Sequence, residues 1–226
     1  MLLLWQHFAI GFSALLPLVN PLGSALVFLG LVGLQPAAVY KSLARQIAIN
    51  VVLFFVVIEL TGSYLLSFFG ISLAIVQLAG GLVLAAMGWS LLNQKVADAT
   101  SDAQAQVASR ADSMNANFQD NTFYPITFPV TVGPGCIVVM LTLSAHATES
   151  TLSGNLLARA GLLLAAAVLA VLVYLCYAYA PQITRTISPP TVHGILRVIA
   201  FILLCIGVQI AWNGLSPLLA TVLHPA

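Results

Sequence analysis

Residues 17–24 read PLVNPLGS and interrupt an apolar run that extends over about residues 7 to 34. The run is long enough for a membrane helix, which needs about 20 apolar residues, yet its middle holds two prolines, an asparagine and a glycine. Proline inside a helix removes a backbone donor and clashes with the preceding turn. In lipid the freed polar groups cannot turn to water, so such a break survives only where protein or a wet cavity satisfies them. The stretch therefore predicts a membrane helix that is broken near its middle, at a place where protein or water satisfies the freed backbone groups.

The whole chain has the composition of an integral membrane protein. Of its 226 residues 61% are hydrophobic and only 6% are charged, whereas a soluble domain carries roughly a quarter charged residues. Long apolar runs lie at about residues 7–34, 44–68, 71–93, 123–146, 156–180 and 194–220. The first run follows MLLLWQH, which lacks the basic segment of a secretory signal, so we expect a retained helix. The prediction is an all-α polytopic membrane protein with six transmembrane helices in a single membrane domain, residues 1–226.

The basic residues predict the orientation of these helices. With six spans, Arg159 lies alone on one side of the membrane. The other side holds Lys41, Arg45, Lys95, Arg110, Arg185 and, at the mouth of the last helix, Arg197. Because cytoplasmic loops are enriched in Lys and Arg, both termini are expected on the periplasmic side of a bacterial inner membrane. The net charge of +1 is dispersed and forms no basic patch, which argues against a nucleic-acid partner.

One extended polar segment, residues 94–122, separates two groups of three spans. It is predicted to be a cytoplasmic linker between repeat one, residues 1–93, and repeat two, residues 123–226. A short surface helix or a disordered chain would both suit its composition. A partner-binding or regulatory role for this loop is the basis of an alternative function, that of a membrane scaffold which transports nothing.

The two halves resemble each other at their first helices. PLVNPLGSALVFLGL at 17–31 matches PVTVGPGCIVVMLTL at 129–143, and both contain a proline and glycine break. Three spans per half make the second half enter the membrane from the opposite side, which gives the inverted repeat of many secondary transporters. The alternative is that helices 1 and 4 are re-entrant hairpins of two half-helices, which would leave four true spans.

Each break has the chemistry of a new helix start. Asn20 before Pro21 is a capping residue before proline at the first helical position, and Gly133 before Pro134 repeats the device. The N–H groups of residues 22–24 and 135–136 are then expected to point unpaired into the membrane, where a helix N-terminus attracts a carboxylate. The predicted substrate site comprises Asn20, Pro21, Gly23, Ser24, Thr131, Gly133, Pro134 and Gly135. The other interpretation is a pair of proline kinks that serve packing alone.

Three further polar residues lie inside the spans and are candidates for coupling or for the pathway. Glu59 either carries a coupling proton or lies close to the outer interface, because an isolated carboxylate is costly in lipid. Arg197 either binds carbonyls freed by a break or reaches the headgroups. Gln77 is suited to an interhelical hydrogen bond. The small residues Gly80, Gly81, Ala85 and Gly88 are expected to permit a close helix contact.

The sequence contains no pattern of catalysis or of metal binding. It lacks a phosphate-binding loop, a nucleophile elbow and any Cys/His pairing at ligand spacing. Cys136, Cys176 and Cys205 all fall within predicted spans, where they act as small packing residues. We therefore expect neither an enzyme nor a cofactor.

Four segments together resemble the MarC family of bacterial inner-membrane proteins. They are PLVNPLGSALVFLGL, FGISLAIVQLAGGLVLAAMGWSLL, PVTVGPG and ILRVIAFILLCIGVQIAWNGL, and the likeness covers all six spans. The family is grouped with exporters of the LysE type, and some similar proteins are described as small neutral amino acid transporters. One departure is that the family often has an arginine before the AGG segment, where this chain has Gln77.

The resemblance implies a secondary transporter of small metabolites, above all small neutral amino acids, with possible proton coupling. The expected partners are a small-molecule substrate, the lipid bilayer and, as an open possibility, further copies of the same chain.

Overall fold

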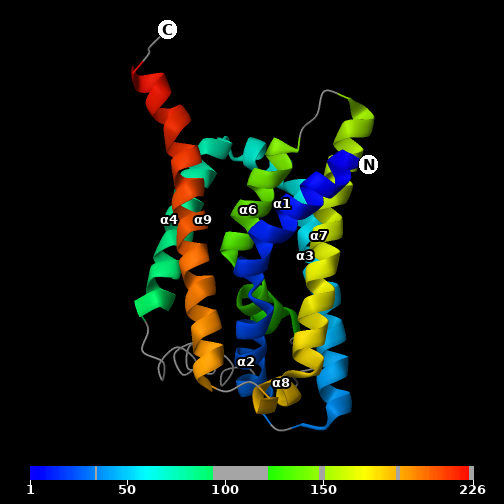
Figure 1. Ribbon diagram of the computed structural model, residues 1–226. Coiled ribbons are helices and arrows are strands. Elements are labelled where there is room, and N and C mark those ends of the chain that lie inside the picture. The colour runs from blue at the N-terminus through cyan, green and yellow to red at the C-terminus, as the bar shows by residue number, and fades with distance from the viewer. Residues whose placement is uncertain (34, 94–121, 148–150, 187–188, 224–226) are drawn as a thin grey trace.

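The computed structural model describes residues 1–33, 35–93, 122–147, 151–186 and 189–223, and every regular element in these ranges is a helix (Figure 1). The elements are α1 (Leu2–Val19), α2 (Pro21–Val32), α3 (Ala37–Phe68), α4 (Leu73–Asn93), η1 (Thr122–Thr131), α6 (Pro134–His146), α7 (Leu152–Ala178), α8 (Ala180–Thr186) and α9 (Pro189–Leu223). The predicted linker, residues 94–122, lies outside the described residues except for Thr122.

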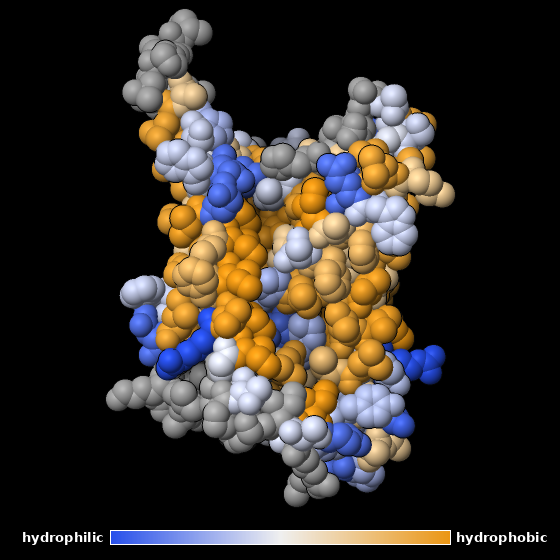
Figure 2. Space-filling view, viewed as in Figure 1, coloured by the Kyte–Doolittle hydropathy of each residue, from blue (hydrophilic) through white to orange (hydrophobic). Residues whose placement is uncertain are grey.

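Five helical stretches are long and apolar enough to cross a membrane: Leu2–Val32, Ala37–Gly62, Leu73–Asn93, Leu152–Ala178 and Gly194–Ala220. A sixth span is formed if the bent pair η1 and α6 crosses as one unit. A hydrophobic band covers the middle of the molecule and polar residues gather toward both ends (Figure 2). Helices suit this environment because they satisfy all their backbone groups internally. The prediction of an all-α, multi-pass membrane protein is therefore confirmed.

The helices run up and down between two ends of the bundle. The N-terminus and the C-terminal end of α9 lie at the same end, where α3 also turns into α4 (Figure 1). The end of α4, α2 and the short α8 lie at the opposite end (Figure 1). This course agrees with the predicted placement of both termini on one side. Which compartment that side faces remains a prediction.

The two breaks, predicted to be alike, differ in the structure. The first lies inside a single 31-residue span, Leu2–Val32. The second bends its helix pair by 67°, and the half that precedes it is irregular. Tyr124 (φ −117°, ψ 128°) and Phe128 (φ −118°, ψ 126°) are extended, because a residue before proline is disfavoured in the helical region and prolines follow both. The run 123–146 is therefore broken, as predicted, but its first half is irregular, and regular α-helix begins at Pro134.

Helix α7 lies at the centre of the packing. It contacts α1, α2 and α3, and small residues such as Ala158, Ala165 and Ala166 let these neighbours approach. Toward its C-terminal end the ring of Tyr177 is fully buried and stacks on Phe28 of α2, with centroids 4.6 Å apart and an interplanar angle of 16°. Helix α7 thus holds the first span against the rest of the bundle.

Helices α4 and α9 form a separate antiparallel pair that is joined through glycine. A Cβ on Gly81 would lie 2.2 Å from the backbone nitrogen of Ala211, and one on Gly207 would lie 2.3 Å from that of Ala85. The same approach recurs where Gly88 meets Leu204 and where Gly214 meets Leu78. The predicted close contact is confirmed for Gly81 and Gly88, whereas Gly80 faces Val138 of α6.

The contacts of this pair are symmetric in sequence. The spacing of Gly81, Ala85 and Gly88 recurs on α9 as Gly207, Ala211 and Gly214. Gly81 contacts Ala211 in the same way as Gly207 contacts Ala85. Likewise, Gly88 contacts Leu204 as Gly214 contacts Leu78. The alignment of residues 17–31 with 129–143 did not reveal this correspondence between α4 and α9. The spacing of the glycines in the sequence was the available signal.

Candidate functional site

The first break is built around Asn20. Its backbone is left-handed (φ 41°, ψ 64°), so that the residue both ends α1 and begins α2. Asparagine tolerates this conformation better than most residues. Its side-chain oxygen accepts a hydrogen bond of 3.1 Å from the N–H of Gly23, and Pro21 occupies the first helical position. The predicted cap, asparagine followed by proline, is confirmed.

Two of the three N–H groups that were predicted to be unpaired at this break have hydrogen-bond partners. Gly23 donates to the side chain of Asn20, and the N–H of Ser24 donates to the carbonyl of Asn20 at 2.9 Å. The hydroxyl of Ser24 also donates to that carbonyl, at 2.9 Å. A Cβ on Gly23 would lie only 2.3 Å from Nδ2 of Asn20, so glycine leaves room for the cap. The cap thus uses the donors that were expected to hold a ligand.

The second break has a different construction. Gly133 begins α6 in an extended conformation without a side-chain cap. The N–H of Cys136 donates to the carbonyl of Gly133 at 3.0 Å, so the prediction of an unpaired group was wrong there too. Pro134 is exposed and Gly135 is buried. A Cβ on Gly135 would meet Cδ2 of Leu84 at 2.2 Å and Cδ2 of Leu18 at 3.2 Å, so apolar side chains cover this residue.

A buried hydroxyl cluster lies between the two breaks. Thr131, just before the second break, lies 2.8 Å from the hydroxyl of Tyr177. The Ser24 hydroxyl at the first break lies near the same phenol, although its own proton is donated to the Asn20 carbonyl. Thr131 already donates to the carbonyl of Ile126 at 2.7 Å. A hydroxyl has one proton, so Tyr177 must be the donor in its bond to Thr131. Ser24 and Thr131 were predicted site residues, whereas Tyr177 was missed.

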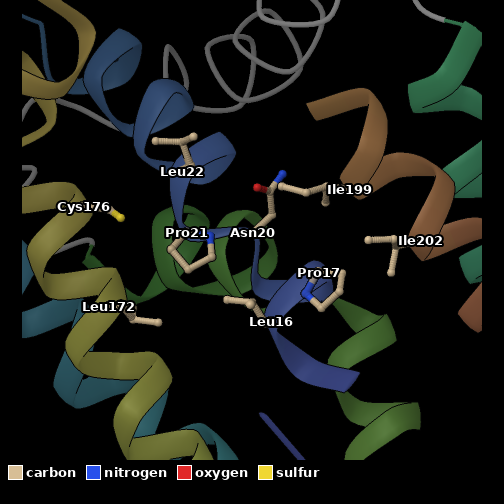
Figure 3. A pocket seen from close by; sticks show the side chains of 9 residues that line it. All are labelled: Leu16, Pro17, Asn20, Pro21, Leu22, Leu172, Cys176, Ile199 and Ile202. Carbon is tan, nitrogen blue, oxygen red and sulfur yellow. The ribbon is translucent and has the colours of Figure 1, made fainter. Parts of the chain in front are cut away.

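A cavity of about 290 Å³ opens beside the first break (Figure 3). Its lining residues are Leu16, Pro17, Asn20, Pro21, Leu22, Leu172, Cys176, Ile199 and Ile202. They come from α1, α2, α7 and α9, and the lining is largely apolar. Since the oxygen of Asn20 faces the Gly23 N–H, the carboxamide orientation is set by that bond. Its nitrogen then lies on the side of Ile199 (Figure 3) and close to Gly23.

The three candidates for coupling or pathway lie elsewhere. Gln77 is buried, and its Cβ lies close to Gly214 of α9, which suits the packing interpretation. Arg197 is exposed on α9. Glu59 is on α3, and none of the three lines the cavity at the first break.

Glu59 is paired, with a partner that the sequence did not identify. Its side chain is 1% exposed, and its Oε1 lies 3.3 Å from Nη1 of Arg159 on α7. It also faces Ser144 on α6, although neither carboxylate oxygen has a hydrogen bond of ordinary geometry within the described part of the chain. Arg159 was interpreted as an orientation signal. Its solitary position on that side of the membrane was the signal that could have suggested a partner.

This ion pair leads to a testable prediction about stability. Arg159→Gln leaves the Glu59 carboxylate buried without its cation, so we expect a loss of about 1–2 kcal/mol of stability, because Arg159 is 40% exposed and water partly replaces the pair. The double variant Glu59→Gln/Arg159→Gln should recover most of that loss. Thermal unfolding of the four proteins in detergent gives the double-mutant cycle. Additive effects of the two changes would contradict an interaction between them.

Comparison with known proteins assigns the chain to a family. The family model described as "MarC family integral membrane protein" matches residues 5–219. The inner membrane protein MarC of Escherichia coli (strain K12 / DH10B) is 28% identical over 223 residues, which cover 98% of this chain and 99% of the relative. The inner membrane protein MarC of Salmonella typhimurium (strain LT2) is 29% identical over 222 residues, with 96% and 98% covered. No solved structure matches the chain. The chain therefore belongs to the MarC family of integral membrane proteins.

Proposed function

We propose that this protein is a secondary transporter of small metabolites, most specifically of small neutral amino acids, in a bacterial inner membrane. The observation that carries the proposal is the meeting of two broken membrane segments at one buried polar cluster, beside a cavity lined by the capping residue of the first break. Irregular backbone at membrane depth is typical of transporter binding sites. In this proposal Ser24, Thr131 and Tyr177 couple the two breaks, and the cavity at Asn20 receives the substrate.

The size and lining of the cavity favour a small substrate with one polar end. Its volume of about 290 Å³ lies at the lower limit of ligand pockets, which span roughly 300–1,000 Å³. The Asn20 amide nitrogen supplies a donor for a carboxylate, and Leu16, Leu172 and Ile202 supply apolar contacts for a short side chain. In this proposal the Asn20 amide binds the carboxylate in place of the N–H groups at the helix N-termini, because most of those groups already have hydrogen-bond partners.

The proposed transport mechanism uses two inverted halves. The symmetric glycine contacts between α4 and α9 support this organisation, because equivalent positions of the two helices meet across the pair. The two breaks, one in each half, support it further. In such transporters one half or bundle moves against the other around a fixed site. We place both termini in the periplasm, on the basis of the Lys and Arg distribution.

In this proposal Glu59 carries the coupling proton. The carboxylate is buried within a membrane helix, where ionisable residues are rare and often belong to proton relays. Its bond to Arg159 offers two states, one paired and one protonated and released. A Glu59→Gln protein would then exchange substrate but fail to accumulate it in response to a pH gradient.

Counterflow in proteoliposomes tests the proposed function. Protein reconstituted with internal unlabelled alanine is expected to take up external labelled alanine, glycine or serine, and Asn20→Leu is expected to abolish the uptake. A variant that lacks residues 98–118 should retain most of the flux, whereas a scaffold that acts through the linker would lose its phenotype. The absence of flux for every small neutral amino acid would contradict the substrate assignment.

A further inference from the structure

Helices α3 and α7 leave an open groove of about 630 Å³ between them, away from the cavity at the first break. On α3 the groove extends from Arg45 to Leu53, and on α7 it extends from Ala167 to Tyr174. Ile49, Leu53 and Val171 are all at least half exposed, so this face is open to the membrane. The small residues Ala48 and Ala167 form part of its floor.

The polar residues of the groove all lie at one end. Two contacts define the antiparallel alignment of the helices: Glu59 binds Arg159, and Nζ of Lys41 lies 5.7 Å from the ring centroid of Tyr179. Arg45 and Tyr174 therefore lie together toward the start of α3. The residues from Arg45 to Leu53 rise by about 12 Å at 1.5 Å per residue, close to the half-thickness of about 15 Å for the hydrocarbon core. The groove has the length and polarity of a lipid in one leaflet.

Among the described residues, the charged end of the groove has no acidic side chain that could act as its counter-ion. Lys41 and Arg45 are one helical turn apart and both are exposed. Within the described ranges, Glu59 is the sole acidic side chain, and it binds Arg159. A guanidinium matches the geometry of a phosphate oxygen pair, and an ammonium one turn away adds a second charge. The two cations are thus placed to neutralise an anionic group at the interface.

We propose that this groove binds one anionic phospholipid of the adjacent leaflet. Arg45 and Lys41 hold the phosphate and the negatively charged headgroup. An acyl chain lies along Ala48, Val52 and Ala167, and the Tyr174 side chain lies at the interface, where tyrosine is enriched. This site is independent of the proposed substrate cavity.

Native mass spectrometry of the purified full-length protein tests the site. The protein is titrated with phosphatidylglycerol and, separately, with phosphatidylcholine that carries the same acyl chains. We expect the anionic lipid to bind at least about tenfold more tightly at low salt, because two basic side chains act together. Lys41→Gln/Arg45→Gln should reduce the affinity for phosphatidylglycerol to that for phosphatidylcholine. The matched control, Lys41→Arg/Arg45→Lys, keeps both charges and should retain the preference.

Ala48→Leu probes the acyl chain separately. It narrows the groove without a change of charge, so both lipids should bind more weakly. Equal binding of the two lipids by the unmodified protein, or an unchanged preference in the Gln double variant, would overturn the proposal. The proposal would also be overturned if the protein formed dimers that Ala48→Leu dissociates while lipid binding persists. The groove would then be an interface between two copies of the chain.

Discussion

Gly207→Val is expected to lower the free energy of unfolding by about 3 kcal/mol or more. A Cβ at this position would lie 2.3 Å from the backbone nitrogen of Ala85 and 2.8 Å from its Cα. Backbone atoms cannot swing aside as a side chain can, so α4 and α9 must separate. Membrane helices associate without a hydrophobic driving force between them, so close van der Waals packing is what such a separation loses.

Gly194→Val provides the matched control for that experiment. Gly194 lies on the same helix, and a Cβ there would meet nothing within 4 Å. Thermal unfolding in detergent, followed by the loss of monodisperse protein on size-exclusion chromatography, compares the two variants. Similar midpoints for Gly207→Val and Gly194→Val would contradict the glycine-mediated contact.

Most of the architecture followed from local features of the sequence. Apolar runs of sufficient length predicted the membrane helices because a bilayer leaves few alternatives to helix. The pairing of Asn20 with Pro21 predicted the first break and its cap, which depends on neighbouring residues alone. At the second break the same reasoning found Gly133 and Pro134 but missed the irregular backbone that precedes them. Pro125 and Pro129 were the available signal.

The prediction of an unpaired N–H group at Gly23 was wrong for a physical reason that was present in the sequence. A side chain that caps a helix consumes the N–H groups that would otherwise bind an anion. Asn20 therefore cannot both cap Gly23 with its oxygen and leave that N–H free. Its amide nitrogen has no such constraint.

The contacts between residues far apart in the sequence could not be predicted in this way. The Tyr177 and Thr131 hydroxyls are 46 residues apart in sequence, and Glu59 and Arg159 are on different helices. Their contacts depend on how α3, η1 and α7 are rotated relative to one another, which an apolar pattern does not define. Tyr177 in particular looks like any interfacial aromatic residue until the fold buries its ring against Phe28.

Tyr177→Phe is the second change with a large expected effect, and it acts on function rather than on folding. Phenylalanine retains the ring that stacks on Phe28 and removes only the hydroxyl that donates to Thr131 and lies near Ser24. Interhelical hydrogen bonds in membranes contribute about 0.6 kcal/mol on average, so the fold should persist. Tyr177 acts as a positioning residue for the two breaks, so the maximal rate of transport should fall more than the substrate affinity does.

Counterflow of labelled alanine in proteoliposomes, measured side by side for the unmodified protein, Tyr177→Phe and Tyr64→Phe, is the most direct test of the proposed site. Tyr64 is 78% exposed on α3, so its variant controls for loss of a tyrosine hydroxyl outside the cluster. We predict clear counterflow in the unmodified protein and in Tyr64→Phe, and a reduction of at least about tenfold in Tyr177→Phe with its thermal stability nearly unchanged. Equal counterflow in all three proteins, or no alanine flux in the unmodified protein, would contradict a transport site where the two breaks meet.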